Sequence, residues 1–393
     1  MGKRAQSSMG VSQEQASLRM LLQYFLRLGS LGFGGPIALT AAMQKDLVDE
    51  RRWFSQHDFK QGMALSQMAP GPLAAQLAIY LGWLHSGWIS AALVGLAFVM
   101  PSFFMVIGLA ALYREWGDLG VIQGLFKGIG PAVIAIIAIG THKLCKKNLE
   151  KNKTLWIVAL VNAAATVITQ SEVLTLMLLS GGALVLQYYA SKRQTARHLG
   201  LLVMPWLVTG LNGPSDVGTL GQILVFFAKA GASVFGSGLA IVPFLHGGVV
   251  NQYHWLNEQQ FLDAIAVAMI TPGPVVITVG FIGFLVAGLA GASLAAFGTF
   301  FPCYLFTVIP APYFHRISQQ PGVHQFVQGV TAAAIGAIGG SVVILAQRSL
   351  HSIPAVVIAL SALLILLRWK KITEPKLILM AACVGLIWQF FLS

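Results

Sequence analysis

The amino-acid sequence predicts an all-α polytopic membrane protein built from two inverted-topology repeats. Hydrophobic residues make up 56% of the 393 positions and charged residues only 10%, whereas soluble proteins average about 25% charged residues. The mean hydropathy of +0.75 points the same way. The chain also repeats itself, and the Lys and Arg content of its loops reverses between the two copies. Composition therefore indicates the membrane, and the loop charges indicate how the copies are oriented.

The repeat emerges when the sequence is shifted by 202 residues against itself. Residues 25–72 then match 227–274 at 12 of 48 positions. A slip of one residue later brings Pro101 onto Pro302. Each copy is about 170 residues long, far longer than a solenoid repeat. The matched residues of the first copy are Phe25, Gly29, Phe33, Gly34, Ala38, Val48, Trp53, Phe59, Ala64, Pro70, Gly71 and Pro72.

Each copy holds about six hydrophobic segments, each near the roughly 20 residues that cross about 30 Å of hydrocarbon as a helix. Helices satisfy their own backbone in lipid, so the segments are expected to be helical. The segments are 20–44, 61–84, 87–112, 120–140, 154–170 and 173–191, then 222–246, 261–286, 289–313, 325–346, 353–368 and 376–392. We expect a polar basic tail (1–18), a first repeat (19–191), a linker (192–218) with a connecting transmembrane segment at 199–213, and a second repeat (219–393).

Loop charge indicates that the copies face opposite ways, because cytoplasmic loops carry an excess of Lys and Arg. The 45–60 loop holds four such residues, whereas its counterpart 247–262 holds none. The strongly basic stretch 143–153 has a nearly uncharged counterpart around Arg348. For the 45–60 loop to share a side with the basic tail, segment 20–44 must dip into the membrane and return. The alternative is that the acidic residues of the loop make it a poor topology signal.

Clusters of Gly and Pro predict breaks inside these segments. Three glycines and a proline in residues 32–36 would cost a plain helix several kcal/mol. Broken helices at membrane depth are tolerated where they are buried in protein or line a wet cavity, and in transporters their N-termini face anionic groups. The alternative is a set of Pro kinks and close-packing glycines. The break residues are Gly34, Gly35, Pro36, Pro70, Gly71 and Pro72 in the first copy, and Gly236, Ser237, Gly238, Pro272, Gly273 and Pro274 in the second.

One cation in each copy lies inside a hydrophobic segment. Arg27 and Lys229 each come just before the matching glycine-rich break. A cation costs about 2.5–3.5 kcal/mol at the centre of a membrane helix, so its occurrence twice asks for a reason. An anion site shared by the two copies is one reason. Snorkelling of a long side chain to the membrane interface is the other.

Polar side chains beside the proline-containing breaks could line a path for the substrate. Gln67, Gln76 and Thr271 lie there, although each could equally make an interhelical hydrogen bond. Glu172 and Asp263 are candidates for a titrating group, but both lie at segment edges, where a solvated carboxylate is expected. The sequence shows no metal-ligand spacing, no phosphate-binding loop and no catalytic set, so we expect neither a cofactor nor a metal.

The motifs also resemble a known family. FLRLGSLGFGGP, ERRWFS, ALSQMAPGPLAAQLAIYLG and FVMPSFF in the first half, and FGSGLAIVP and ITPGP in the second, are similar to the chromate ion transporter family in its long two-domain form. The resemblance covers most of residues 20–345. It implies a multi-pass protein of the bacterial inner membrane that exports chromate. Two departures, Leu39 after the first glycine-rich break and Met269 where the first copy has Gln67, bear on the substrate more than on the fold.

The function expected from these observations is export of a small tetrahedral oxyanion, chromate, driven by the membrane potential or a proton gradient. A dianion leaving a negative-inside cell gains about 4.6 kcal/mol per 100 mV. Sulfate has the same shape and charge, so transport of sulfate or another anion, or an anion channel, is the alternative; an intramembrane enzyme fits less well. The net charge of +12 comes from short loops between apolar runs, which argues against a nucleic-acid partner. The lipid bilayer is the expected surrounding, and a homodimer is left open.

Overall fold

The computed structural model describes residues 16–117, 119–150, 152–170, 174–191, 218–235, 238–314, 320–369 and 372–391. All regular elements in these ranges are helices. The first repeat contains α1 (Leu18–Leu31), α2 (Gly35–Met43), η1 (Gln44–Glu50), α3 (Gln56–Met68), α4 (Leu73–Ser86), α5 (Trp88–Trp116), α6 (Gly120–Asn148), α7 (Lys153–Thr169) and α8 (Leu174–Ser191). The expected connecting segment 199–213 lies outside the described residues.

The second repeat reproduces this order. It contains α9 (Thr219–Ser233), η3 (Gly238–Ala240), α10 (Ile241–Leu245), η4 (His246–Gln252), α11 (Glu258–Ile270), η5 (Val275–Ile277), α12 (Thr278–Val308), η6 (Ala311–Tyr313), α14 (Pro321–Ser349), α15 (Ile353–Arg368) and α16 (Glu374–Phe391). Even irregular features recur at the same offset: η1 and η4 are both π-helices. Arg52 and His254 are both left-handed, with φ of 55° and 50°. The repeat is therefore structural as well as sequential.

The first hydrophobic segment is a helical hairpin made of α1 and α2. Tyr24 in α1 donates its hydroxyl to Asp46 Oδ2, which follows α2 in the chain, over 3.1 Å. The Arg51 guanidinium lies 5.4 Å from the centre of the Tyr24 ring. The chain therefore turns back at residues 32–34, as the prediction of a returning segment 20–44 requires; its depth in the membrane stays a prediction.

The second hydrophobic segment is also a hairpin, which differs from the full crossing that 61–84 suggested. Gly62 in α3 lies against the ring of Tyr80 in α4, and both residues are nine positions from Gly71. His85 at the end of α4 is 2.7 Å from the carbonyl oxygen of Ala16, just before α1. Both hairpins thus return to the end of the molecule from which α1 starts. The reason is that Pro70 and Pro72 stop α3 and start α4 with a left-handed glycine between them.

Long helices form the body of the molecule. In the part of the chain that the structure describes, four helices are long and apolar enough to cross a membrane: α5, α6, the α12 region and α14. α12 begins as the return arm of the second repeat's hairpin and is interrupted by non-helical Ala287 and Gly288 before its long crossing. Close helix contacts rest on small residues: Gly128 of α6 meets Gly385 of α16, and Gly329 of α14 meets Gly181 of α8.

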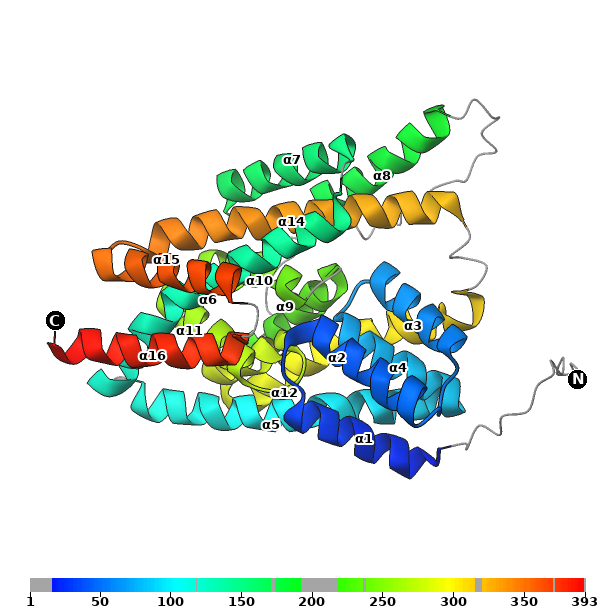
Figure 1. Ribbon diagram of the computed structural model, residues 1–393, viewed down its shortest axis with the longest axis horizontal. Helices are drawn as coiled ribbons and strands as arrows, with labels where there is room; N and C mark the ends of the chain where they lie inside the picture. Colours follow the sequence, from blue (N-terminus) through cyan, green and yellow to red (C-terminus); the bar gives the residue numbers. More distant parts are fainter. Residues whose placement is uncertain are drawn as a thin grey trace, which may run out of the picture.

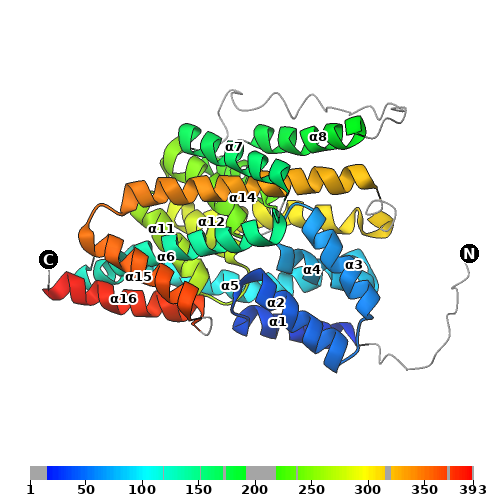
Figure 2. The same cartoon turned by 45° about the horizontal axis from the view of Figure 1, so that its top comes forward.

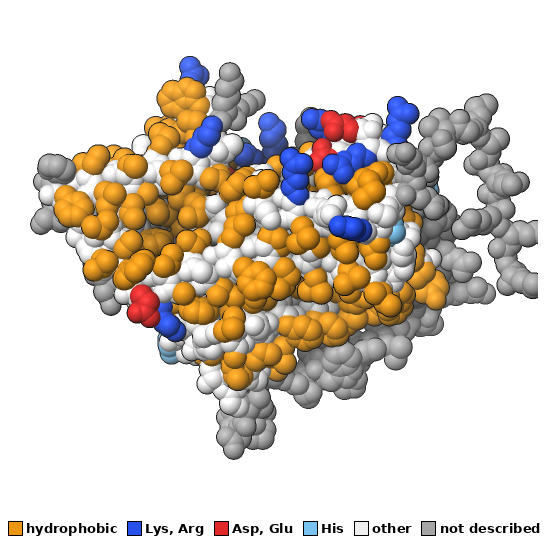
Figure 3. All heavy atoms as spheres, turned by 90° about the horizontal axis from the view of Figure 1, so that it is seen from below, with side chains coloured by type: hydrophobic (Ala, Val, Ile, Leu, Met, Phe, Trp, Pro, Cys, Tyr) orange, Lys and Arg blue, Asp and Glu red, His pale blue; other side chains and the backbone are white. Residues whose placement is uncertain are grey.

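Equivalent helices of the two repeats point in opposite directions. α8 ends on the right of Figure 1, whereas its counterpart α16 ends on the left, and the rotated view in Figure 2 agrees. The face in Figure 3 is covered largely by hydrophobic side chains, with Lys and Arg gathered along its upper edge. Large hydrophobic side chains are exposed on several helices, among them Ile89 on α5, Ile168 on α7 and Ile353 on α15. The chain is an all-α polytopic membrane protein with inverted repeats.

Candidate functional site

The predicted helix breaks are present in the first repeat. α1 ends at Leu31 and α2 begins at Gly35, with Pro36 in its first turn. Gly34 and Gly35 have φ of 106° and 72°, and Gly71 has φ of 142°. These are conformations that favour glycine. α3 ends at Met68 and α4 begins after Pro72, so Pro70 and Pro72 flank a true interruption.

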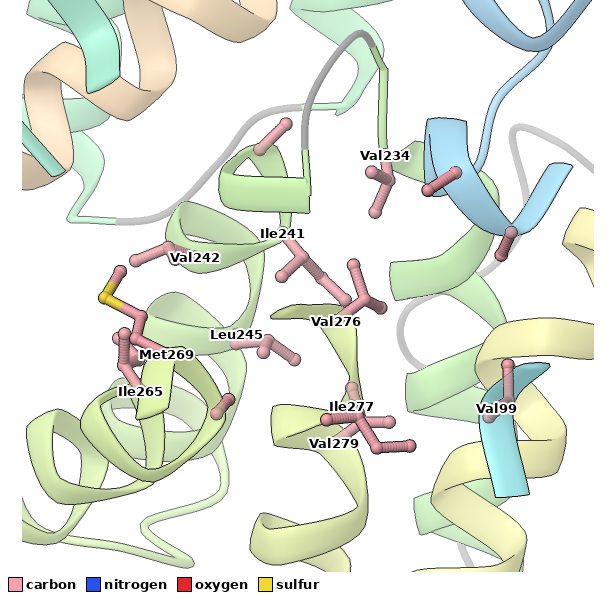
Figure 4. Close-up of a cluster of buried hydrophobic side chains, with 14 of the residues drawn as sticks. Val99, Val234, Ile241, Val242, Leu245, Ile265, Met269, Val276, Ile277 and Val279 are labelled. Atoms are coloured by element: carbon pink, nitrogen blue, oxygen red, sulfur yellow. The ribbon is translucent and has the colours of Figure 1, made fainter. Parts of the chain in front are cut away.

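The second repeat is broken at the corresponding places. α9 ends at Ser233 and α11 ends at Ile270. Gly273 has φ of 99°, and Pro274 precedes the short helix η5. Gly238 begins η3, while Gly236 and Ser237 lie outside the described residues. Figure 4 shows Ile241 and Val276 next to each other, and both side chains are buried.

The breaks of the two repeats are joined to each other by a reciprocal pair of hydrogen bonds. The amide of Gly71 donates to the carbonyl oxygen of Val234 over 2.6 Å. The amide of Gly273 donates to the carbonyl oxygen of Gly32 over 2.8 Å. Adding 202 to 71 and 32 gives 273 and 234, so the two bonds are the same bond related by the repeat. The four breaks therefore meet where the two repeats face each other.

A second reciprocal contact lies beside these bonds. A β-carbon on Gly273 would collide with Ser102 Oγ, and one on Gly71 would lie 3.0 Å from Cys303 Sγ. Ser102 and Cys303 are equivalent at the offset of 201 that pairs Pro101 with Pro302. Ser102 donates to the carbonyl oxygen of Gly29 over 3.2 Å, and Cys303 is fully buried. Sequence reasoning assigned no role to Cys303, although the Pro101 and Pro302 match was the signal for its position.

The three predicted polar side chains have different surroundings. Gln76 is fully buried; its Nε2 donates to the Pro70 carbonyl oxygen over 2.8 Å, and its Oε1 has no hydrogen-bond partner among the described residues. Thr271 donates its hydroxyl to the carbonyl oxygens of Val267 and Ala268, on its own helix. Gln67 is exposed. Only Gln76 thus places a free polar atom against a break.

The two predicted cations lie on the outside of their helices. Arg27 and Lys229 are both exposed. Two residues further on, Gly29 packs against Phe98 of α5 and Gly231 against Thr299 of α12. Two positions on a helix are about 200° apart, so each cation points away from that contact. The structure places them equivalently in the two repeats, and the paired-cation site stays a prediction.

A polar pocket of about 310 Å³ opens at the end of the molecule where α6 ends and α14 begins. Its polar residues come from three regions far apart in sequence: the end of α3, the α6–α7 turn and the start of α14. They include Gln67, Lys147, Asn148, Glu150, Asn152, His324, Gln328 and Thr331. The pocket thus reaches from the basic 143–153 stretch to Gln67, three residues before Pro70.

The opposite end of α14 is closed by a network that the sequence did not reveal. Arg348 donates to Glu258 Oε1 and to Gln170 Oε1, and over 2.9 Å to Asn251 Oδ1. Buried His246 is bonded to Glu258 Oε2 over 2.9 Å. Arg348 is equivalent to Lys147 at the offset of 201, and about 36 Å of helix separates it from His324. At the Arg348 end of α14, hydrogen bonds connect the two repeats. At the equivalent Lys147 end of α6, the pocket is open.

Asp263 corrects one sequence interpretation. We expected a solvated carboxylate at a segment edge, but Asp263 is 2% exposed. It accepts hydrogen bonds from Tyr113 Oη over 2.7 Å and from Gln259 Nε2 over 2.8 Å. The reason is tertiary: the end of α5 from the first repeat covers this turn of α11. Glu172 lies outside the described residues.

Among the described residues, no three His, Cys, Asp or Glu side chains group in a way that could hold a metal ion. Glu258 forms an ion pair with Arg348 and a hydrogen bond with His246. The polar atoms near the breaks are amide, hydroxyl and thiol groups together with backbone amides and carbonyls. Such a set suits recognition of a small ion by hydrogen bonds.

The sequence matches a family model described as chromate transporter, over residues 19–186 and again over 221–386. It is 55% identical to the chromate transport protein of Cupriavidus metallidurans over 374 residues, covering 94% of this chain and 93% of that protein. It is 31% identical to the chromate transport protein of Pseudomonas aeruginosa, covering 95% and 93% of the two chains. No solved structure matches the chain. The two matched stretches coincide with the two structural repeats, and the chain belongs to the chromate transporter family.

Proposed function

We propose that this protein exports chromate from the bacterial cytoplasm across the inner membrane. The observation that carries the proposal is the reciprocal pair of hydrogen bonds, Gly71 to Val234 and Gly273 to Gly32. In carriers made of inverted repeats, the substrate binds near the midplane where broken helices of the two repeats meet. The break residues, with Gln76, Ser102 and Cys303 beside them, are the proposed substrate site.

The asymmetry between the two ends supports the cytoplasm as the loading side. The pocket that opens beside Gln67 includes Lys147 and is flanked by the basic 143–153 stretch, and Lys-rich and Arg-rich loops belong on the cytoplasmic side. The equivalent place at the other end is tied by Arg348, Glu258 and Gln170. This arrangement corresponds to an inward-facing state. An outward-facing state would form by opening the Arg348 network and closing the pocket.

The membrane potential is a sufficient driving force for export. Each negative charge that leaves a negative-inside cell gains about 2.3 kcal/mol per 100 mV. A proton gradient is the other source we propose. No bound nucleotide is needed in either case. We also propose that the two repeats span residues 19–191 and 219–393, and that the protein is a transporter and not an enzyme. Sulfate as a second substrate and a homodimer stay predictions of the sequence.

The test is anion flux in proteoliposomes at a fixed membrane potential. We expect chromate flux to saturate with chromate concentration and to follow the sign of the potential. Inhibition of this flux by added sulfate measures how strongly sulfate competes. Protein-free vesicles give the background. A flux that never saturates indicates a channel, and sulfate flux without chromate flux assigns the other substrate. Absence of flux for every anion tested would reject the proposal.

A further inference from the structure

The carboxamide of Gln76 is held inside the first repeat's break. A β-carbon on Gly71 would lie 2.7 Å from Gln76 Nε2 and 2.9 Å from its Cδ. Nε2 donates to the carbonyl oxygen of Pro70 over 2.8 Å. A carbonyl oxygen accepts and cannot donate, so this bond fixes which end of the amide is nitrogen. The other end, Oε1, is therefore an acceptor.

Oε1 is buried and has no hydrogen-bond partner among the described residues. Gln76 is fully buried, and an unsatisfied buried polar atom costs about 1–3 kcal/mol. Because this atom lies in the proposed substrate site, we expect a bound ligand to satisfy it. Because Oε1 can only accept, the ligand must present a hydrogen to it.

The helix that carries Gln76 narrows the choice of ligand. Gln76 lies in the first turn of α4, whose N-cap is Pro72 and has no side-chain cap. The amides of Leu73, Ala74 and Ala75 have no acceptor within their own helix. This end of a helix attracts anions and repels cations. A hydrated metal cation would satisfy Oε1 but not these amides, whereas an anion with one hydroxyl group would satisfy both.

The equivalent Pro272–Pro274 break of the second repeat has no such free acceptor at the position that matches Gln76. Thr278 is the counterpart of Gln76 at the offset of 202. Its hydroxyl donates to the carbonyl oxygen of Val275 over 2.7 Å, within its own turn. Among the described residues at the breaks, the free acceptor therefore lies in the first repeat alone, and it makes the otherwise symmetrical site selective for one end of its substrate.

We propose that the site binds the monoprotonated form of a tetrahedral oxyanion, with its hydroxyl donating to Gln76 Oε1 and its other oxygens facing the first-turn amides of α4. This inference rests on the proposed function. Hydrogen chromate exchanges its proton near neutral pH, whereas sulfate is fully deprotonated there. A sulfate ion would bring an unprotonated oxygen against Oε1, and two acceptors in contact repel. One atom thus discriminates between two ions of the same shape. Each chromate would leave together with a proton, so of the two proposed driving forces only the membrane potential, acting on the remaining single negative charge, would favour export.

The test is the concentration of total chromate that gives half-maximal flux, measured at a fixed potential over a series of pH values. We expect this concentration to rise about tenfold per pH unit above the pH at which hydrogen chromate is half deprotonated, because only the protonated fraction binds. Sulfate should compete weakly at every pH. This series uses the wild-type protein, so it does not depend on any variant folding.

Two variants localise the effect. Gln76→Leu removes the acceptor, so the pH dependence should flatten and sulfate should compete better relative to chromate. Thr278→Val is the matched control and should keep the wild-type pH dependence. A half-saturating concentration that is constant or falls with rising pH would show that the dianion binds and that Oε1 does not select the protonated form; the inference would then fail while transport stands. Absence of chromate flux at every pH would instead reject the proposed function.

Discussion

Gly273 donates its amide hydrogen to the carbonyl oxygen of Gly32 over 2.8 Å, at a point where Ser102 fills the space that a side chain on Gly273 would need. The contact joins two breaks from different repeats through backbone atoms alone. Its counterpart joins Gly71 to Val234. Position 273 therefore requires glycine for two separate reasons: its backbone has a left-handed φ of 99°, and a side chain there would have no room.

Gly273→Ala should destabilise the protein by about 1–3 kcal/mol and reduce flux per molecule, because it adds strain at a positive φ and pushes Ser102 aside. Adding Ser102→Gly to this variant should recover the stability lost to the steric clash, but not the stability lost to backbone strain. Thermal unfolding of the single and double variants in detergent separates the two contributions. Strict additivity would mean that the side chains do not meet.

Gly87→Ala is the matched control for backbone strain. Gly87 has φ of 81°, but a β-carbon there would meet nothing within 4 Å. Gly87→Ala should lose stability through backbone strain but not through crowding. Ser102→Gly should therefore not restore the stability of this variant. Equal losses at Gly87 and Gly273 would remove the steric argument.

The helix breaks could be predicted because Gly and Pro act locally and because the repeat showed each signal twice. The hairpin of α1 and α2 followed from loop charge. The hairpin of α3 and α4 did not, since a segment of 24 residues has the length of a full crossing. The Arg348 network and the burial of Asp263 were out of reach because the partners, Gln170 and Tyr113, come from the other repeat. Such contacts depend on how the repeats pack.

Labels on opposite loops test the inverted topology. Cysteines introduced at Arg52 and His254 should react from opposite faces of the membrane, because the 45–60 loop holds four Lys and Arg residues and the 247–262 loop holds none. Both positions are exposed and have matching left-handed backbones. The measurement is labelling of intact cells by an impermeant maleimide, before and after permeabilisation.

The parent chain with its native cysteines gives the background for this labelling. Cys303 is buried, and Cys145 is partly exposed in the basic 143–153 stretch. A variant lacking Cys145 should therefore label less than the parent after both faces are open. Reaction of Arg52→Cys and His254→Cys from the same face would contradict the inverted arrangement.

The two segment cations are tested by charge removal. If they attract the anion, Arg27→Gln and Lys229→Gln should each lower flux per molecule of membrane protein, and Arg27→Lys should keep part of it. Both side chains are exposed in the structure. If they only snorkel to the interface, neutral variants should lower the amount of inserted protein and leave normalised flux and chromate affinity unchanged. Lys60→Gln, in the 45–60 loop, is a control for general charge loss.

Glu258 gives a prediction on pH. It begins α11, outside the four long apolar helices, and holds Arg348 and His246. Burial acts to raise its pKa, but hydrogen bonds from His246 and Arg348 outweigh burial and hold the pKa below the usual 4.5. A lowered carboxyl pKa stabilises the folded state at pH values above 4.5, and this contribution is lost as the pH falls through the lower folded-state pKa. The wild-type protein should therefore unfold at a higher temperature than Glu258→Gln at neutral pH, and the gap should close in acid below pH 4.5.

Glu115→Gln is the control for this pH series. Glu115 pairs with Arg114 over 3.4 Å, but both side chains are more than half exposed, and exposed ion pairs contribute little. Its unfolding temperature should stay close to that of the wild type at every pH. If the gap between wild type and Glu258→Gln stays constant from neutral to acid pH, the Glu258 carboxylate is not ionised in the folded protein. The network would then be held by neutral hydrogen bonds, and the closed end would not depend on charge.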